Sequence, residues 1–227
     1  MDKALIRYLE GFITERRRAL FRKVLEHRTR YLTVVLEDLY QPHNASAVLR
    51  SCECFGIQDV HIIENRNKYT VNPDIALGAS KWLNLIKYHG EENNTRRAVE
   101  SLRGQGYRIV VTVPGEAATP LERFDLSRGK AALFFGTEMN GLTDTAISMA
   151  DEKLVIPMYG FTESFNISVS AGIILSHLVP RLHRSEGWQL SPEEKETIYF
   201  EWLKRSIRSS DRIIEEWTKE HARQGNR

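Results

Sequence analysis

Short segments rich in Val, Ile, Leu and Phe recur through the middle of the chain and alternate with stretches of helical periodicity. The apolar segments are YLTVVLEDL (31–39), DVHII (59–63), YRIVVTV (107–113), AALFFG (131–136) and KLVIP (153–157). The helical stretches are ASAVLRSCECFG, which ends at Gly56, two pieces around 73–80 and 92–103, and a segment that begins at Thr143. Apolar strands that alternate with helices are typical of a mostly parallel sheet with helices on both faces. The sequence therefore predicts an α/β domain over residues 31–180.

Helical patterns flank this domain on both sides. Between Asp2 and about His27, apolar residues recur at helical spacing and predict one or two amphipathic helices. NISVSAGIILSHLVPRLHR (166–184) predicts a buried helix that Pro180 kinks or ends. A last helix, with an apolar stripe for docking, has Ser191 as its N-cap and Pro192 at its first position. We expect a basic helical extension over residues 1–30 and a C-terminal helical extension over 181–227.

Charge is distributed unevenly along the chain. Residues 1–30 carry nine Lys and Arg against four Asp and Glu, whereas residues 31–180 carry thirteen against seventeen. A basic arm on a mildly acidic body favours a polyanionic partner, although a solvated helix face would look the same. The first residues contain no signal sequence and no apolar run is long enough to span a bilayer, so we expect a cytoplasmic protein with no membrane partner. Cys52 and Cys54 would diverge around a helix, so we expect structural thiols and no metal site.

Ligands of parallel sheets bind beyond the carboxyl ends of the strands, where four loops of this chain are candidates. They are EDLYQPHNAS (37–46), TVPGE (112–116), FFGTEMNGL (134–142) and the segment IPMYGFTESFNISVSAGIIL (156–175), a loop that leads into a helix. No phosphate-binding loop of the Walker type occurs, and the glycines at 104 and 106 precede a strand instead of following one. The apolar loops instead suit an uncharged, flat group such as adenine, held by main-chain groups. In the first loop, Asn44 or Ser46 would cap the following helix.

Three ordered motifs carry a resemblance to a known family. HNASAVLRSCECFGIQDVHII, LFFGTEMNGLTDTAISMAD and LVIPMYGFTESFNISVSAGIIL resemble the three motifs of the SPOUT RNA methyltransferases. Their branch is the one that contains tRNA (guanosine-18) 2′-O-methyltransferase. The resemblance covers residues 31–178 and implies a C-terminal deep trefoil knot, S-adenosylmethionine as cofactor, a homodimer and tRNA as partner. Methyl transfer to a ribose 2′-hydroxyl needs no metal, and a 2′-hydroxyl is absent from DNA.

The resemblance also implies roles for individual residues. Catalytic and substrate-binding roles fall on Asn44, Arg50, Glu138, Ser164 and Asn166, and cofactor contacts on Thr112, Gly136, Ile156, Met158 and Phe165. Arg50 has been given the role of base in similar enzymes. An arginine stays protonated, however, so orienting the phosphate and stabilising the developing alkoxide is physically easier. Helix capping is an alternative role for Asn44, Ser164 and Asn166, because all three are residue types that commonly cap helices. His43 is another candidate base.

Phosphate binding is expected of Arg16, Arg17 and Arg18 in the basic arm. Methylation of guanosine 18 in tRNA is the leading functional hypothesis. The alternatives are methylation of ribosomal RNA or of another tRNA ribose, a catalytically silent RNA-binding module, and a nucleotide-binding dehydrogenase.

Overall fold

The strands of the computed structural model form one sheet in which every pair is parallel. The structure describes residues 2–69, 78–115, 117–137 and 140–224. Its strands are β1 (Leu32–Glu37), β2 (Asp59–Ile63), β3 (Asn84–Tyr88), β4 (Arg108–Thr112), β5 (Thr119–Pro120), β6 (Ala131–Phe135) and β7 (Glu152–Val155). They are arranged in the order β3-β2-β1-β6-β4-β7-β5. Leu36 of β1 pairs with Phe135 of β6, so these two central strands end side by side.

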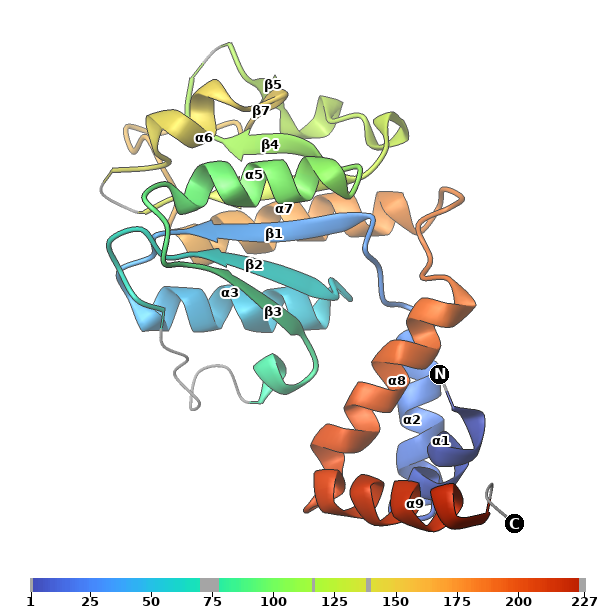
Figure 1. Ribbon diagram of the computed structural model, residues 1–227. Coiled ribbons are helices and arrows are strands. Elements are labelled where there is room, and N and C mark those ends of the chain that lie inside the picture. The colour runs from blue at the N-terminus through green and yellow to red at the C-terminus, as the bar shows by residue number, and fades with distance from the viewer. Residues whose placement is uncertain (1, 70–77, 116, 138–139, 225–227) are drawn as a thin grey trace. The chain divides into compact units, whose positions relative to one another are not determined.

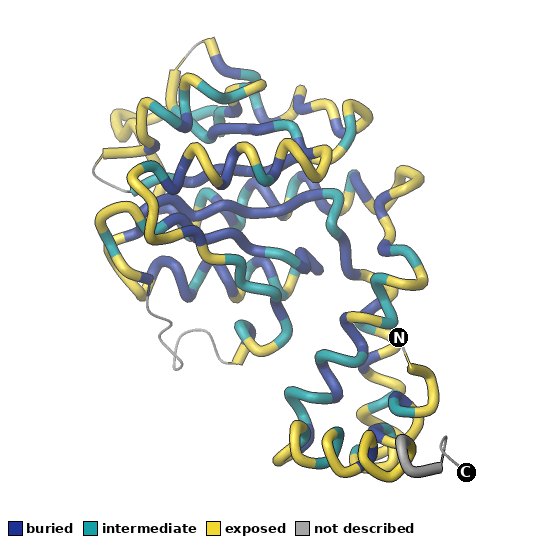
Figure 2. Tube along the Cα trace, viewed as in Figure 1, coloured by how far each residue is buried: buried dark blue, intermediate teal, exposed yellow. Residues whose placement is uncertain are grey.

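Helices cover both faces of this sheet (Figure 1). The longer elements are α3 (Pro42–Cys54), α5 (Asn94–Gly104), α6 (Asp144–Ser148) and α7 (Ile167–Leu182), joined by short 3-10 turns at Ala79–Lys81, Leu121–Arg123 and Leu126–Arg128. One apolar core packs α3 and α7 against side chains such as Val34, and a second packs α5 and α6 against side chains such as Val35. Figure 2 shows the strands buried along most of their length. The predicted α/β class with a mostly parallel sheet is confirmed, while the trefoil knot stays a prediction.

The chain divides into two compact units. Residues 29–189 form the α/β unit, and residues 1–28 together with 190–227 form the helical unit. The helical unit contains α1 (Lys3–Glu10), α2 (Glu15–Leu25), α8 (Pro192–Ser206) and α9 (Ser210–Gln224). Phe21 of α2 packs edge-on against Tyr199 and Trp202 of α8, with the ring centroids 6.3 and 5.5 Å apart. Among the described residues, no helix is both long and apolar enough to cross a membrane.

Three helix boundaries differ from the expectation. Helix α3 begins at Pro42 with Gln41 as N-cap, so Asn44 and Ser46 lie inside the helix and the predicted cap was wrong. Proline starts the helix earlier because it lacks the N–H that a first turn leaves unpaired and its φ is already helical. Pro180 does not end α7, which continues to Leu182.

The expected C-terminal helix is two helices, because Ser209 adopts a φ of 60° between α8 and α9. Ser191 does cap α8, through a hydrogen bond that its hydroxyl accepts from the N–H of Glu194. The piece expected around 73–80 lies mostly outside the described residues.

Candidate functional site

A cavity of about 670 Å³ lies at the carboxyl ends of three neighbouring strands, β4, β6 and β7. Three turns line it: the residues after Thr112, residues 135–137 together with 140–142, and the residues after Val155. The first turns of α7 complete the wall with Ile167, Ser170 and Ile174. Of the four candidate loops, three therefore converge on one space. The fourth, residues 37–46, contributes no described lining residue.

The turn after β6 is narrow because its two arms touch. The N–H of Thr137 donates to the carbonyl of Gly141 at 2.9 Å, and the N–H of Gly141 donates back to the carbonyl of Thr137 at 3.0 Å. A Cβ atom added to Gly136 would lie 2.2 Å from the carbonyl carbon of Gly141 and 2.4 Å from the nitrogen of Leu142. Both of these are main-chain atoms that cannot rotate away. Only glycine therefore allows the turn to close in this form.

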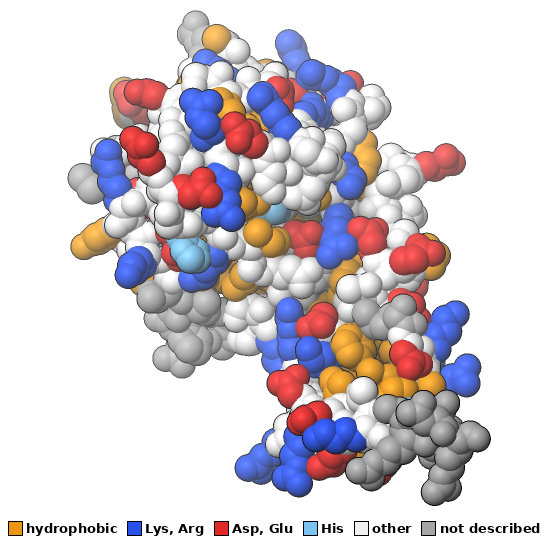
Figure 3. Space-filling view, in the orientation of Figure 1, with side chains coloured by type: hydrophobic (Ala, Val, Ile, Leu, Met, Phe, Trp, Pro, Cys, Tyr) orange, Lys and Arg blue, Asp and Glu red, His pale blue; other side chains and the backbone are white. Residues whose placement is uncertain are grey.

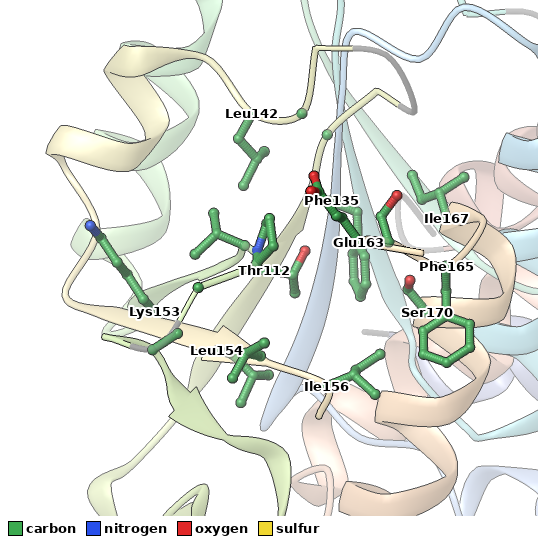
Figure 4. A pocket seen from close by; sticks show the side chains of 18 of the residues that line it. Thr112, Phe135, Leu142, Lys153, Leu154, Ile156, Glu163, Phe165, Ile167 and Ser170 are labelled. Atoms are coloured by element: carbon green, nitrogen blue, oxygen red, sulfur yellow. The ribbon is translucent and has the colours of Figure 1, made fainter. Parts of the chain in front are cut away.

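The lining is largely apolar and main-chain. Figure 4 shows Phe135, Leu154 and Ile156 around the cavity, with Lys153 on the side away from Phe165. The Thr112 hydroxyl donates to the carbonyl of Phe134 at 2.7 Å, so it is committed to the strand end. Among the described lining residues the charged side chains are Lys153 and Glu163. Such walls suit a flat, largely uncharged group and offer little to a pyrophosphate, which needs several N–H donors or cations.

The residues predicted to contact a cofactor come together in this cavity. Thr112, Gly136, Ile156, Met158 and Phe165 all line it, and so does Ser164. Glu138 lies outside the described residues. Among the described residues no group of three or more His, Cys, Asp or Glu could hold a metal ion.

Two further predicted residues, Asn44 and Asn166, meet across 122 positions of sequence. The Nδ2 of Asn166 donates to the Oδ1 of Asn44 at 3.2 Å. Asn166 also caps α7, because its Oδ1 accepts from the N–H of Ser168 at 2.9 Å. Asn44 is 5% exposed and its Nδ2 donates to Gln41. The bond ties the first turn of α3 to the first turn of α7, next to cavity residues Phe165 and Ile167.

Arg50 lies apart from the described cavity lining. It is exposed near the end of α3, the helix that packs beside α7. His43, the alternative base, is exposed in the first turn of the same helix.

The three arginines expected to bind phosphates lie in the helical unit. They occupy the first turn of α2, which Thr14 caps by accepting a hydrogen bond from the N–H of Arg17 at 3.3 Å. Arg18 is ion-paired with Glu15, and the Arg17 guanidinium lies 5.7 Å from the centre of the Phe21 ring. The positive end of the helix dipole adds to these charges.

Sequence reasoning missed two charged lining residues, Lys153 and Glu163. Lys153 sits inside the apolar segment KLVIP, where its strand position gives no sign that it faces a cavity. Glu163 was part of a candidate segment, but nothing in its spacing distinguishes it from a solvated loop carboxylate.

Comparisons with known proteins agree with this geometry. The model of the SpoU rRNA Methylase family matches residues 31–176. The tRNA (guanosine(18)-2′-O)-methyltransferase of Borreliella burgdorferi is 42% identical over 88% of this chain and 90% of its own length. The enzyme of the same name from Thermus thermophilus is 30% identical over 85% of this chain and 98% of its own length.

Among solved structures, the TrmH/SpoU tRNA modifying enzyme of A. aeolicus superposes with a TM-score of 0.76 at 28% identity. The superposition covers 86% of this chain and 98% of that one. With the second and third motifs lining one cavity and matches along most of its length, the chain belongs to the SpoU rRNA methylase family.

Proposed function

We propose that the protein transfers a methyl group from S-adenosylmethionine to the ribose 2′-hydroxyl of guanosine 18 in tRNA. The observation that carries this proposal is that turns of the second and third motifs line one cavity beside the Asn44–Asn166 hydrogen bond, to which the first motif contributes Asn44. The relatives that match along most of the chain are named for this reaction.

The cavity fits the cofactor. An adenine ring suits the apolar walls at Ile156, Leu142 and Phe165, where main-chain groups of the turns can bind its edge. Gly136 lets the main chain of its turn come close, and Thr112 fixes the end of β4. When bound, S-adenosylmethionine supplies an activated methyl group, so the protein's task is to align the acceptor and accept a proton.

The residues at the two helix starts would hold the acceptor ribose. Asn44 is held by both Gln41 and Asn166, so its position relative to the cavity wall is fixed. Ser164 lines the cavity and places a hydroxyl there. Arg50, exposed on α3, would bind the phosphate next to the ribose and stabilise the oxygen as it loses its proton. Because a guanidinium remains protonated, we give Arg50 this electrostatic role instead of that of base.

We propose that a second copy of the chain completes the site. The start of α7 and the loop before it expose apolar side chains: Tyr159 is 98% exposed and Val169 46%. Exposed apolar groups of this kind, grouped next to a cavity, are typical of a subunit interface. Arg50 lies on the neighbouring helix and would reach the acceptor bound across such an interface.

Transfer RNA would meet the first turn of α2. The arginines at 16, 17 and 18 combine with the positive end of the helix dipole, which attracts phosphate without reading sequence. Figure 3 shows Lys and Arg interspersed with Asp and Glu over the visible face.

The experiment is methylation of defined RNAs by the purified protein with isotopically labelled S-adenosylmethionine, followed by mapping of the modified ribose. We expect label at guanosine 18 of a tRNA transcript, and none in a transcript carrying 2′-deoxyguanosine at that position. Label at another tRNA position, or only in ribosomal RNA, would show that guanosine 18 of tRNA is not the substrate. Failure to bind S-adenosylhomocysteine in calorimetry would refute the methyltransferase assignment.

A further inference from the structure

Among the described residues, two buried carboxylates, Glu37 and Asp38, have no role in the proposed reaction. Glu37 is the last residue of β1 and is 1% exposed. Val35, two positions earlier, packs in the core under α5 and α6, so the Glu37 side chain points to the same face. Burying a carboxylate is costly unless hydrogen bonds satisfy its oxygens, so its partners indicate what keeps it there.

Those partners are two threonines. The N–H of Thr143 donates to Oε2 of Glu37 at 2.8 Å, and the Thr143 hydroxyl donates to Oε1 at 2.8 Å. The hydroxyl of Thr95, in the first turn of α5, donates to Oε1 as well. Thr143 thus donates to both oxygens of one carboxylate, and hydrogen bonds to an ionised acceptor are about twice as strong as neutral ones.

These hydrogen bonds bear on the cavity because Thr143 directly follows Leu142, which lines it. The turn that lines the cavity begins at Gly136, directly after Phe135, which pairs with Leu36. Its far arm, Gly141 and Leu142, leads into Thr143. Glu37 therefore stands beside the start of this turn and binds the residue at its end.

We infer that Glu37 is a positioning residue that holds the cavity wall formed by residues 136–137 and 140–142 in its cofactor-binding form. The inference rests on the proposed function, because it takes S-adenosylmethionine as the ligand. Glu37 does not touch the cavity itself, so its effect reaches the ligand through Thr143 and Leu142. Loss of the clamp should lower cofactor affinity much more than turnover at saturating cofactor.

The test is a double-mutant cycle read by calorimetry with S-adenosylhomocysteine and by steady-state methylation. Glu37→Gln keeps the shape but removes the charge and one acceptor oxygen, and Thr143→Val removes the hydroxyl. Each should raise the Kd by about tenfold, as expected for one charge-assisted hydrogen bond. The effects of the two substitutions should be less than additive, because both weaken the bond between the Thr143 hydroxyl and Glu37. The Thr143 hydroxyl also caps α6 by accepting a hydrogen bond from the N–H of Ala146, and a loss of affinity that came from the cap alone would instead add to that of Glu37→Gln.

Two controls separate this role from a general loss of stability. Thr143→Ser keeps both bonds, and Thr95→Val removes a bond to the same carboxylate from outside the turn; both should bind within about twofold of wild type. If Glu37→Gln does not fold, the comparison of Thr143→Val with Thr143→Ser carries the test.

A folded Glu37→Gln protein with wild-type Kd, or one that loses kcat at unchanged Kd, would overturn the inference. A wild-type protein that does not bind S-adenosylhomocysteine would instead overturn the proposed function.

Discussion

The two compact units of the chain offer ligands different chemistry. The α/β unit provides a cavity built from main-chain turns and apolar side chains, and residues 29–189 carry sixteen Lys and Arg against eighteen Asp and Glu. The helical unit carries sixteen against twelve and has three arginines in one helical turn. A small nucleoside needs a closed, shaped space, whereas a nucleic acid needs positive charge on an open surface. We expect cofactor binding to depend on the first unit and general RNA affinity on the second.

The interiors of the two units also differ in their ionisable groups. In the α/β unit, the ring of His61 stacks on Tyr88 and its Nδ1 lies 3.0 Å from the Tyr88 hydroxyl. In the helical unit, Glu10 accepts hydrogen bonds at 2.7 Å from both Arg22 and the Tyr199 hydroxyl. We therefore expect acid to lower the folding stability of the α/β unit and alkali to lower that of the helical unit.

The largest effect is expected from Gly136→Ala. The added methyl group collides with the main chain of Gly141, so the turn must open and cofactor affinity should fall by about a thousandfold or more, roughly 4 kcal/mol. Calorimetry with S-adenosylhomocysteine measures this loss. Gly160→Ala is the matched control, since its added methyl group meets no atom within 4 Å. The RNA affinity of Gly136→Ala, measured by filter binding, should equal that of wild type. If RNA affinity falls as much as cofactor affinity, cofactor binding and RNA binding do not depend on separate units.

Arg50→Ala should lower kcat by about a hundredfold to a thousandfold, the usual cost of losing one donor to a developing oxyanion. Its cofactor affinity should stay within about tenfold of wild type, because Arg50 lies outside the described cavity lining. Single-turnover methylation separates the two effects. Arg123→Ala, which removes another exposed arginine of the α/β unit, should be neutral. An active Arg50→Ala enzyme would remove Arg50 from the mechanism.

The α/β unit should lose stability in acid through His61. Burial lowers the pKa of His61 from 6.5 to about 4, against the opposing attraction of Asp59. The unfolded chain therefore takes up a proton at a higher pH than the folded one, and stability present above pH 6.5 is lost as the pH falls toward 4. The change is on the order of 3 kcal/mol. Urea unfolding at several pH values measures it, and His61→Phe should flatten the acid side of the curve.

Replacing Arg16, Arg17 and Arg18 by alanine should weaken tRNA binding by about tenfold and lower the salt dependence by two to three units of slope, roughly one for each phosphate that is no longer neutralised. Cofactor affinity should not change. Replacement of Arg212 and Lys219, which pair with Glu216 and Glu215 on α9, serves as the control within the same unit. Binding and slope equal to wild type would place the RNA surface elsewhere.

The smallest effect concerns Tyr199 in the helical unit. Burial, together with its hydrogen bond to Glu10, raises the pKa of Tyr199 to about 12. The folded state therefore holds this proton more tightly than the unfolded state. The stability gained is complete below pH 10 and is lost as the pH rises toward 12. In Tyr199→Phe the alkaline decline of the unfolding midpoint should be smaller than in Tyr8→Phe, which alters an exposed tyrosine.

Hydrophobic patterns in the sequence predicted the central strands of the sheet but not its edge strands. Four of the five segments predicted as strands contain β1, β2, β4 and β6, and the fifth overlaps β7, which begins one residue earlier at Glu152; each segment is rich in apolar residues. Periodicity missed β3 and β5, since NLIKY has only two adjacent aliphatic residues between polar ones and Thr119–Pro120 is only two residues long. The break before α9 was also missed, because serine gives no signal for the positive φ of Ser209.

The loops that line the cavity were predictable from the positions of the strand ends, whereas the individual site residues were predicted only through the family motifs. Local sequence favoured a capping role for Asn44, yet the residue lies inside α3 and binds Asn166, which is 122 positions away. Likewise, nothing near Glu37 in sequence indicates that its partner is Thr143, 106 positions later. Interactions of this range depend on strand order, which hydrophobic spacing does not specify.

The two ends of the α/β unit, near residues 29 and 189, contact each other. Thr29 pairs with Gln189 and its hydroxyl donates to the carbonyl of Trp188 at 2.7 Å. During synthesis, α1 and α2 emerge first but must wait for α8 and α9, about 160 residues later, before their aromatic core can assemble. The ribosome thus delivers the α/β unit with its cavity before the helical unit can assemble, so the nascent chain would form its proposed cofactor site before its proposed RNA-binding surface.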